Sequence, residues 1–254
     1  MNVKAKKYLG QHFLINKSIS QKIVDSINFK NNHNVIEIGP GTGSLTHFLI
    51  TKTSQLKIIE IDVDCVEIVK RKFPNVEVLC ADFLKFDLNK IGYSQYSIIG
   101  NFPYNISSQI LFKVLENRNN INQVVGMFQK EVAERVCSRP KSKKYGILSV
   151  LLQAYFHCDL LFDVSPDNFK PQPKVYSSVI KLSRNNIKEL DCDHSKFIVI
   201  VKLGFSQRRK KLKNALKKII NLEDWSTNIM MAKRAEELSV SDFIELTKLL
   251  FPKS

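Results

Sequence analysis

Short runs of β-branched and aliphatic residues alternate with longer amphipathic stretches along the first two-thirds of the chain. The apolar runs predict strands at Val35–Ile38, Leu56–Ile61, Val76–Leu79, Ser97–Gly100 and Val124–Phe128, and a further pair around Leu160–Val164 and Val175–Leu182. The amphipathic stretches predict helices at Ile19–Ile27, Ser44–Thr51, Cys65–Lys72, Ser107–Glu116 and Glu131–Cys137. Such an alternation is typical of an α/β fold, in which a parallel sheet is buried on both faces by helices.

The pattern changes near residue 183. The segment Arg184–His194 is polar and lacks periodicity, so we interpret it as a linker. Beyond it the signals are helical only, and an apolar stripe at helical spacing comprises Leu212, Ala215, Leu216, Ile219 and Ile220. Ser239 and Asp242 form a candidate capping box at the start of a last helix. We therefore predict an α/β domain over residues 1–183 and a small all-helical domain over residues 184–254.

The composition limits the class of protein. With 254 residues, 44% of them hydrophobic, the chain can bury one sizeable core and a small second one. No apolar run is long enough to cross a bilayer, and the basic N-terminus lacks the apolar stretch of a secretion signal. The five cysteines are scattered and never in Cys-x-x-Cys spacing, which indicates reduced thiols in the cytoplasm and no metal site.

The formal net charge of +15 favours polyanionic partners, because neutralised phosphates release their counterions. From Lys202 to Lys218 the chain has eight basic residues and no acidic one, so the charge is concentrated. We expect a nucleic-acid backbone to contact the start of a basic helix there, at Arg208, Arg209, Lys210 and Lys211. The alternative is a merely solvated face.

A glycine-rich loop, Glu37-Ile38-Gly39-Pro40-Gly41-Thr42-Gly43, follows the first predicted strand and precedes a helix. Its glycines let the backbone turn tightly and approach a ligand closely. The spacing is one residue shorter than the dinucleotide fingerprint, which favours a ligand without phosphates. With Glu37 before it, the loop resembles the first motif of class I S-adenosylmethionine methyltransferases. A glycine-rich turn with no ligand is the alternative.

Two carboxylates end the next two predicted strands. Glu60 is placed where it can accept hydrogen bonds from both ribose hydroxyls of a nucleoside, in NAD as well as in S-adenosylmethionine. Asp82 follows the third strand and is placed to accept a hydrogen bond from the cofactor's adenine amine. Acids are common at strand ends and in caps, but these features at three successive strands together predict a nucleoside-cofactor site.

The segment Gly100-Asn101-Phe102-Pro103-Tyr104-Asn105 follows the fourth strand and borders the same crevice. Methyl transfer to the exocyclic amine of adenine requires a nitrogen with a delocalised lone pair to become tetrahedral. The Asn101 side-chain oxygen and the Pro103 carbonyl can favour this change by accepting hydrogen bonds from the amine, while Tyr104 stacks on the ring. No general base is needed, so catalysis would depend on orientation and electrostatics. A proline turn capped by asparagine is the alternative.

Phe169 precedes the last predicted strand in the proline-rich segment Phe169-Lys170-Pro171-Gln172-Pro173-Lys174-Val175. Its ring can stack on the other face of a base that has been extruded from structured nucleic acid. A core phenylalanine beneath a proline loop is an equally open interpretation.

Further blocks accompany these motifs along nearly the whole chain. They are Gln11-His12-Phe13-Leu14, Gln129-Lys130-Glu131-Val132-Ala133-Glu134-Arg135, Tyr145-Gly146-x-Leu148-Ser149-Val150, Phe205-x-Gln207-Arg208-Arg209-Lys210 and Arg234-Ala235-Glu236-Glu237-Leu238-Ser239. The series resembles the bacterial small-subunit ribosomal RNA adenine N6,N6-dimethyltransferase family, known as KsgA or RsmA. The resemblance implies a class I Rossmann-like sheet and S-adenosyl-L-methionine as donor. It also implies dimethylation of two adjacent adenines in a hairpin loop near the 3′ end of 16S rRNA, late in assembly of the small subunit.

The resemblance also implies residue roles. The cofactor would contact His12, Leu14, Gly39, Glu60, Asp82 and Asn101. The target base would be surrounded by Asn101, Pro103, Tyr104 and Phe169. Phe102 stands where leucine is more usual in the family, and His12 where asparagine is often found; we do not expect His12 to act as a base. A monomer is expected.

Three other functions fit part of the pattern. A large-subunit RNA adenine methyltransferase of the macrolide-resistance kind shares the fold and the Asn-x-Pro-aromatic motif, but the Tyr145–Val150 block and the basic residues from Arg208 argue against it. A non-catalytic RNA-binding factor would not need the intact motif acids and Asn101. An adenine-specific DNA methyltransferase would require a larger target-recognition domain.

Overall fold

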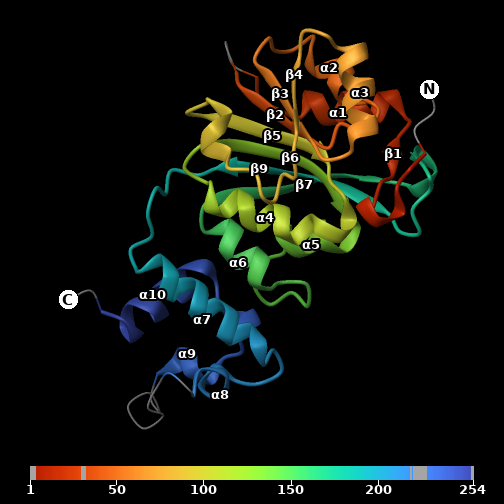
Figure 1. The fold of residues 1–254 in the computed structure, drawn as a ribbon. Helices are drawn as coiled ribbons and strands as arrows, with labels where there is room; N and C mark the ends of the chain where they lie inside the picture. The colour runs from red at the N-terminus through yellow and green to blue at the C-terminus, as the bar shows by residue number, and fades with distance from the viewer. Residues whose placement is uncertain (1–3, 30–32, 218, 220–227, 253–254) are drawn as a thin grey trace. The chain divides into compact units, whose positions relative to one another are not determined.

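In the part of the chain that the computed structural model describes, residues 4–29, 33–217, 219 and 228–252, seven strands form one sheet (Figure 1). Their order is β4-β3-β2-β5-β6-β9-β7. The bounds are β2 Val35–Ile38, β3 Leu56–Glu60, β4 Glu77–Cys80, β5 Tyr96–Asn101, β6 Ile121–Gln129, β7 Phe156–Val164 and β9 Ser177–Arg184. The strands from β2 to β6 pair in parallel, so their carboxyl ends meet at one edge of the sheet.

Helices cover both faces of this sheet. Their bounds are α1 Lys17–Asp25, α2 Thr46–Leu49, α3 Val63–Lys72, α4 Ser107–Glu116 and α5 Lys130–Cys137. Figure 1 shows α1, α2 and α3 on one face and α4 on the opposite face. All four residues of β2 are buried, which confirms the burial on both faces that the apolar strands predicted. The predicted strands and helices of this region are present, with ends shifted by a few residues.

The sheet departs from the predicted parallel pairing at one strand. β9 pairs with β6 in the antiparallel direction, from Gln129↔Ser177 to Gln123↔Ser183. Parallel neighbours need a long crossover, usually a helix. The segment between β7 and β9 contains only a 3-10 turn at Pro166–Asn168 and the two-residue strand β8, Phe169–Lys170. That strand pairs with β1, Phe13–Leu14, to form a small second sheet.

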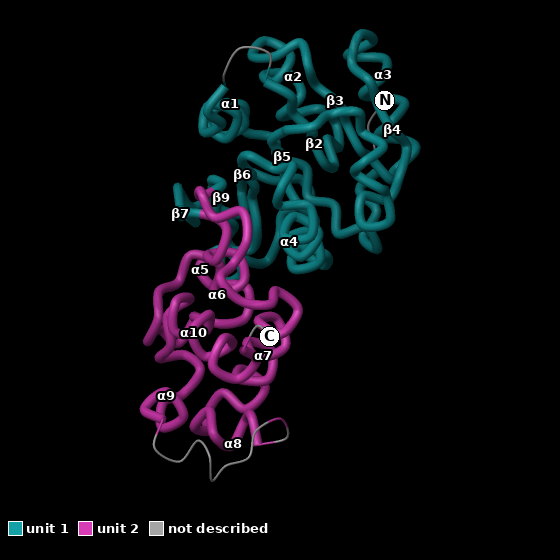
Figure 2. The backbone as a smooth tube through the Cα atoms, turned by 90° about the vertical axis from the view of Figure 1, so that its left-hand side faces the viewer, with its two compact units in different colours: residues 1–133, 157–184 teal, residues 134–156, 185–254 magenta. Residues whose placement is uncertain are grey.

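By its contacts the chain divides into two compact units, which Figure 2 colours separately. Unit 1 comprises residues 1–133 and 157–184, and unit 2 comprises residues 134–156 and 185–254. The predicted boundary lay between 183 and 184, and residues 134–156 were assigned to the α/β domain. In the structure residues 134–156 belong to unit 2, because α6, Ile147–Gln153, packs against α7 and α10. This segment therefore shares the core of the helical unit before the chain returns to β7.

Unit 2 consists of helices in its described residues. Their bounds are α6 Ile147–Gln153, α7 His194–Ser206, α8 Leu212–Leu216, α9 Ile229–Ala232 and α10 Val240–Leu250. The predicted capping box is present, since the Asp242 N–H donates to Ser239 Oγ and the Ser239 N–H donates to the Asp242 carboxylate. The predicted linker, Arg184–His194, begins with the last residue of β9 and ends with the first residue of α7, and residues 185–193 between them contain no helix or strand.

The apolar stripe of this unit is shorter than predicted. Leu212, Ala215 and Leu216 are buried on α8, but the helix ends at Leu216 and Ile219 is 38% exposed. Ile220 and Lys218, which belonged to the predicted stripe and basic run, lie outside the described residues. No helix among the described residues is long and apolar enough to cross a membrane.

Candidate active site

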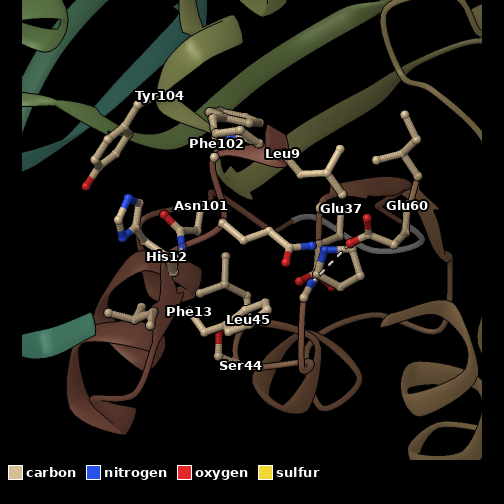
Figure 3. Close-up of a pocket in the computed structure, with 18 residues that line it drawn as sticks. Leu9, His12, Phe13, Glu37, Ser44, Leu45, Glu60, Asn101, Phe102 and Tyr104 are labelled. Atoms are coloured by element: carbon tan, nitrogen blue, oxygen red, sulfur yellow. Dashed lines mark hydrogen bonds between the residues drawn. The ribbon is translucent and has the colours of Figure 1, made fainter. Parts of the chain in front are cut away.

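A cavity of unit 1 lies at the carboxyl ends of β2, β3 and β5 and brings together four parts of the chain (Figure 3). It is lined by residues 9–14 of the N-terminal segment, Glu37, Gly39, Pro40, Gly41, Ser44 and Leu45 of the glycine loop, Glu60 and Ile61 at the end of β3, and residues 101–104 after β5. Because these strands are neighbours in the sheet, the glycine loop, Glu60 and the Asn101 motif share one site, as predicted.

The glycine loop owes its shape to backbone angles that favour glycine. Gly39 has φ +64° and Gly41 has φ +56°. A Cβ placed on Gly39 would meet no atom within 4 Å, so this residue faces open space in the cavity. A Cβ on Gly41 would lie 2.8 Å from the Phe13 ring. Gly39 therefore leaves room for a ligand, whereas Gly41 leaves room for the N-terminal segment.

Glu37 lines the cavity and is 1% exposed. Its Oε2 accepts a hydrogen bond from Thr46 Oγ1 at 2.7 Å, while Oε1 has no partner among the described residues. Burial raises the pKa of this carboxyl to about 8, although the Thr46 hydrogen bond opposes the shift. A buried acceptor without a partner is costly. The cavity therefore offers a strong acceptor to a cationic donor such as an ammonium group.

Glu60 is 5% exposed and holds two turns of the site together. Its Oε1 accepts the Asp62 N–H at 2.8 Å, and its Oε2 accepts the Gly41 N–H at 3.3 Å. Burial raises its pKa, and these backbone hydrogen bonds oppose the shift. A carboxylate oxygen has more than one lone pair, so both oxygens can still accept hydrogen bonds from ribose hydroxyls.

The N-terminal segment is fastened over this cavity by an acidic residue that sequence reasoning missed. Asp62 is 2% exposed, caps α3, forms an ion pair with Lys6 and accepts a hydrogen bond from Gln11 Nε2 at 2.7 Å. Lys6 also pairs with exposed Asp64 at 2.7 Å. Burial alone would raise the pKa of Asp62, but the hydrogen bonds from Lys6 and Gln11 outweigh it and lower the pKa.

The segment continues into the small second sheet. Leu14, a predicted cofactor contact, lines the cavity and pairs with Phe169 in the register of β1 and β8. Phe169 is 3% exposed and belongs to the same hydrophobic cluster as Leu14. The structure thus places Phe169 in the core, as the alternative interpretation had it, and it does not line the cavity.

Asn101 is the last residue of β5 and lines the cavity. Its Nδ2 donates to the His12 carbonyl at 2.8 Å. The Pro103 carbonyl, predicted as the second acceptor for a target amine, already accepts the Ile106 N–H at 3.3 Å and Ser107 Oγ–H at 3.1 Å. No described residue donates to the Phe102 carbonyl, which precedes it in the cavity wall.

The unusual Phe102 fits because glycines surround it. The residue is 1% exposed, and its ring lies 4.9 Å from that of Phe128 between centroids. A Cβ on Gly126 would lie 2.1 Å from the Phe102 ring, and one on Gly100 would lie 2.7 Å from it. The space that these two glycines leave is filled by the larger aromatic side chain.

Asp82 does not line the cavity. It lies two residues beyond β4 and its Oδ1 accepts the Leu84 N–H at 2.9 Å, while its carbonyl accepts the N–H groups of Lys85 and Phe86. In this structure its carboxylate caps a turn, which is the plain alternative for an acid at a strand end.

The four basic residues of unit 2 differ in their surroundings. They form the turn that leads from α7, which ends at Ser206, into α8, whose N-cap is Lys211, so they lie directly before a helix start. Arg209, Lys210 and Lys211 are exposed. Arg208 is half-buried: its Nε donates to Glu236 at 2.9 Å and its guanidinium donates to the Tyr145 carbonyl at 3.0 Å.

The sequence matches the model of one protein family, "Ribosomal RNA adenine dimethylase", over residues 2–251. The chain belongs to this family. A relative from Cytophaga hutchinsonii, "Ribosomal RNA small subunit methyltransferase A", is 50% identical over 99% of both chains. A relative of the same name from Flavobacterium johnsoniae is 48% identical over 97% of this chain and 95% of its own. The enzyme class and the cofactor predicted above, an rRNA adenine dimethyltransferase that uses S-adenosylmethionine, are thereby confirmed.

Solved structures agree with the fold of this dimethylase family. A dimethyladenosine transferase from Plasmodium falciparum superposes with a TM-score of 0.80 at 26% identity, over 92% of this chain and 96% of that chain. The 23S rRNA methyltransferase ErmE superposes with a TM-score of 0.69 at 24% identity, over 93% and 99% of the two chains. The second likeness concerns the fold alone. The predicted α/β methyltransferase sheet with a helical C-terminal region is confirmed.

Other functional contacts of this family member had no signal in the sequence. Lys6 and Asp62 are 56 positions apart, and Tyr104 contacts Ser177 across 73 positions. Neither pairing follows from periodicity or spacing. Gln11 belongs to one of the family blocks, but no pattern in the sequence pairs it with Asp62.

Proposed function

We propose that the chain dimethylates N6 of two adjacent adenines in a hairpin loop near the 3′ end of 16S rRNA, in the assembling small subunit. The observation that carries this proposal is the side-chain oxygen of Asn101, which borders the same cavity as the buried carboxyls of Glu37 and Glu60. Such a site can hold a cationic nucleoside donor beside an acceptor for an aromatic amine. The names of the relatives at 50% and 48% identity support the small-subunit RNA as substrate.

The residues present fit S-adenosylmethionine. The Glu37 oxygen without a partner suits its ammonium group, and the open space at Gly39 suits a ligand that passes close to the backbone. Glu60 at the end of β3 suits the ribose. When bound, the cofactor supplies an electrophilic methyl group on a sulfonium. Unlike charges attract strongly away from water, so the carboxylates of Glu37 and Glu60 also favour the cationic cofactor over the product that has lost the sulfonium charge.

Asn101 has the central part in our proposed mechanism. Since its Nδ2 donates to the His12 carbonyl, its Oδ1 is left to accept a hydrogen bond from the target amine. The Phe102 carbonyl is the better second acceptor, because the Pro103 carbonyl is engaged within its own turn. Pro103 then acts by fixing the backbone, with φ −57°, between these acceptors and Tyr104. Two acceptors draw the amine toward tetrahedral geometry, and the proton leaves to water after transfer.

We assign the remaining predicted contacts as follows. His12 and Leu14 border the cofactor, and Tyr104 stacks on the target adenine. Asp82 and Phe169 would serve the cofactor adenine and the target base only after a rearrangement of the turn and of the small sheet that now hold them. Arg209, Lys210 and Lys211 contact the RNA backbone from unit 2. We expect the protein to act as a monomer in the cytoplasm, which light scattering of the purified chain would check.

The experiment that tests this function compares ribosomal RNA from strains with and without the gene by mass spectrometry. We expect paired dimethyladenosines of 16S rRNA to disappear on deletion and to return with the wild-type gene but not with Asn101→Ala. Persistence of these marks, or loss of a large-subunit mark in their place, would overturn the proposal.

A further inference from the structure

The aromatic ring that is proposed to stack on the target adenine is held at its hydroxyl. Tyr104 Oη and Ser177 Oγ are 2.6 Å apart, within hydrogen-bond distance. Ser177 is fully buried at the first position of β9 and pairs opposite Gln129 of β6. Because β9 is bonded to β6 along its length, the serine is a fixed point, and the Tyr104 ring cannot turn away without losing this hydrogen bond.

The same ring is held on one face. The His12 ring lies 5.3 Å from that of Tyr104 between centroids, with an interplanar angle of 25°, and Figure 3 shows the two rings side by side at one end of the cavity. His12 is itself oriented, because its Nδ1 lies 2.7 Å from the Pro171 carbonyl. A carbonyl oxygen only accepts, so this ring nitrogen carries a proton and donates it.

Both supports come from one stretch of chain. Pro171 directly follows β8 and Ser177 is the first residue of β9, so residues 171–177 reach Tyr104 directly through Ser177 and indirectly through His12. The plane of the ring is therefore set before any substrate binds. A stacking platform that is already ordered loses less conformational entropy when a base docks on it.

We propose that Ser177 is a positioning residue, which with His12 fixes the plane of the Tyr104 ring so that an adenine stacked on the face opposite His12 presents its amine to Asn101. The inference rests on the proposed function of the site. It assigns no chemical step to Ser177, which lies outside the cavity lining and acts only through Tyr104.

The test is a double-mutant cycle with Ser177→Ala and Tyr104→Phe, both of which remove one side of the hydrogen bond and keep the ring. The readouts are kcat and KM for the RNA that the wild-type protein methylates, and the fluorescence of 2-aminopurine placed at the target position. We expect each single variant to lower kcat/KM about fivefold and to weaken the stacking signal, and the double variant to lose no more than either single one. Ser177→Thr, which keeps a hydroxyl, should restore most of the activity.

Ser178→Ala is the matched control. Ser178 is the next residue on β9, is equally buried, and donates to Asp163 Oδ1 at 2.6 Å, away from Tyr104. We expect this variant to leave kcat/KM and the fluorescence unchanged, and both serine variants to bind S-adenosylmethionine as the wild type does. Additive losses in the cycle, or equal effects of Ser177→Ala and Ser178→Ala, would overturn the inference. If the wild type methylates another RNA, the proposed substrate is wrong, but the same cycle on that RNA still decides the role of Ser177.

Discussion

The side-chain amide of Asn101 donates a hydrogen bond to the backbone carbonyl of His12 at 2.8 Å. This contact fixes which end of the amide points away from the N-terminal segment. The donor end is used within the protein, and the acceptor end remains for an amine in the cavity. The N-terminal segment therefore not only covers the cofactor loop but also orients the residue on which methyl transfer depends.

Replacing this amide should affect the chemical step. We expect Asn101→Ala to lower kcat at least about 100-fold, since one preorganised hydrogen-bonding group typically contributes about 3–4 kcal/mol in a transition state. Asn101→Asp should also be impaired, because a carboxylate cannot donate to the His12 carbonyl. Single-turnover methylation measures this loss, and thermal unfolding shows whether the fold is kept. A variant with wild-type single-turnover rates would contradict the assignment.

The buried carboxyl of Glu37 predicts a proton-linked binding step. Its pKa is raised to about 8 by burial, so it is mostly protonated at neutral pH before the cofactor binds. A bound ammonium group favours the carboxylate, so binding should release a proton and the affinity should increase from about pH 6 to about pH 8. Calorimetry in two buffers of different ionisation enthalpy measures the proton. Glu37→Gln should remove both the proton release and the pH dependence; an unchanged release would assign the proton elsewhere.

The same group affects the stability of the cofactor-free protein. The folded pKa of Glu37, about 8, is above the ordinary value of 4.5, so the folded state binds more protons between these two values. Its contribution to the free energy of unfolding is therefore fully present below about pH 4.5 and is lost as the pH rises through about 8. Urea unfolding across this range should show a falling free energy of unfolding for the wild type and a flatter profile for Glu37→Gln.

The fastening of the N-terminal segment should control cofactor binding. Asp62→Asn removes the charge that Lys6 pairs with, and it keeps an oxygen that can cap α3. We expect the Kd for S-adenosylmethionine to increase about tenfold, because hydrogen bonds to a buried charge contribute about 1.5–3 kcal/mol. Equilibrium dialysis measures this constant.

Asp64→Asn is the control for this change. Asp64 contacts the same lysine, but its side chain is 61% exposed, and exposed ion pairs contribute little. We expect it to bind the cofactor as the wild type does. The lowered pKa of Asp62 keeps its carboxylate charged until the pH falls below the usual range for an aspartate. Below that pH the carboxylate is protonated, so the difference in Kd between the wild type and Asp62→Asn should become smaller. Equal Kd values for the two variants would show that the segment is held by other contacts.

The positions of Glu60 and Asn101 could be predicted because they depend only on local sequence. Each ends an apolar run, and the alternation of strands with helices brings the carboxyl ends of parallel strands to one edge. The role of Phe169 could not be predicted, since a phenylalanine beside prolines is compatible with a core and with a binding surface. Its pairing with Leu14, across 155 positions, decides that it is in the core here.

The side-chain partners of residues that are distant in the sequence could not be predicted either. No pattern in the sequence pairs Asp62 with Lys6 or Gln11, and only the folded chain shows these contacts. β9 reverses direction because the segment between β7 and β9 has no helix that could serve as a parallel crossover. The apolar pattern predicts the strand but not the direction in which it runs. Periodicity reports which face of an element is buried, but not which distant residue buries it.

The basic turn of unit 2 gives the last prediction, because its adjacent arginines should behave differently. Arg208 joins the 142–145 turn to Glu236, through its Nε–Glu236 contact at 2.9 Å and its bond to the Tyr145 carbonyl. Removing it leaves these acceptors without a donor, so Arg208→Ala should lower the thermal stability. Arg209 is exposed, and its guanidinium forms no hydrogen bond or ion pair with another described residue, so Arg209→Ala should leave stability unchanged.

RNA-binding measurements distinguish the stabilising role of Arg208 from the phosphate contact that we propose for Arg209. If Arg209 neutralises one phosphate, Arg209→Ala should reduce the slope of log Kd against log salt by about 1. Lys188→Ala, which removes an exposed charge from the linker segment, is the control and should leave the slope unchanged. Titrations of 16S rRNA fragments at several salt concentrations measure the slopes. A slope that falls for Arg208→Ala but not for Arg209→Ala would reverse the assignment, since the half-buried arginine would then have to leave Glu236 for the RNA.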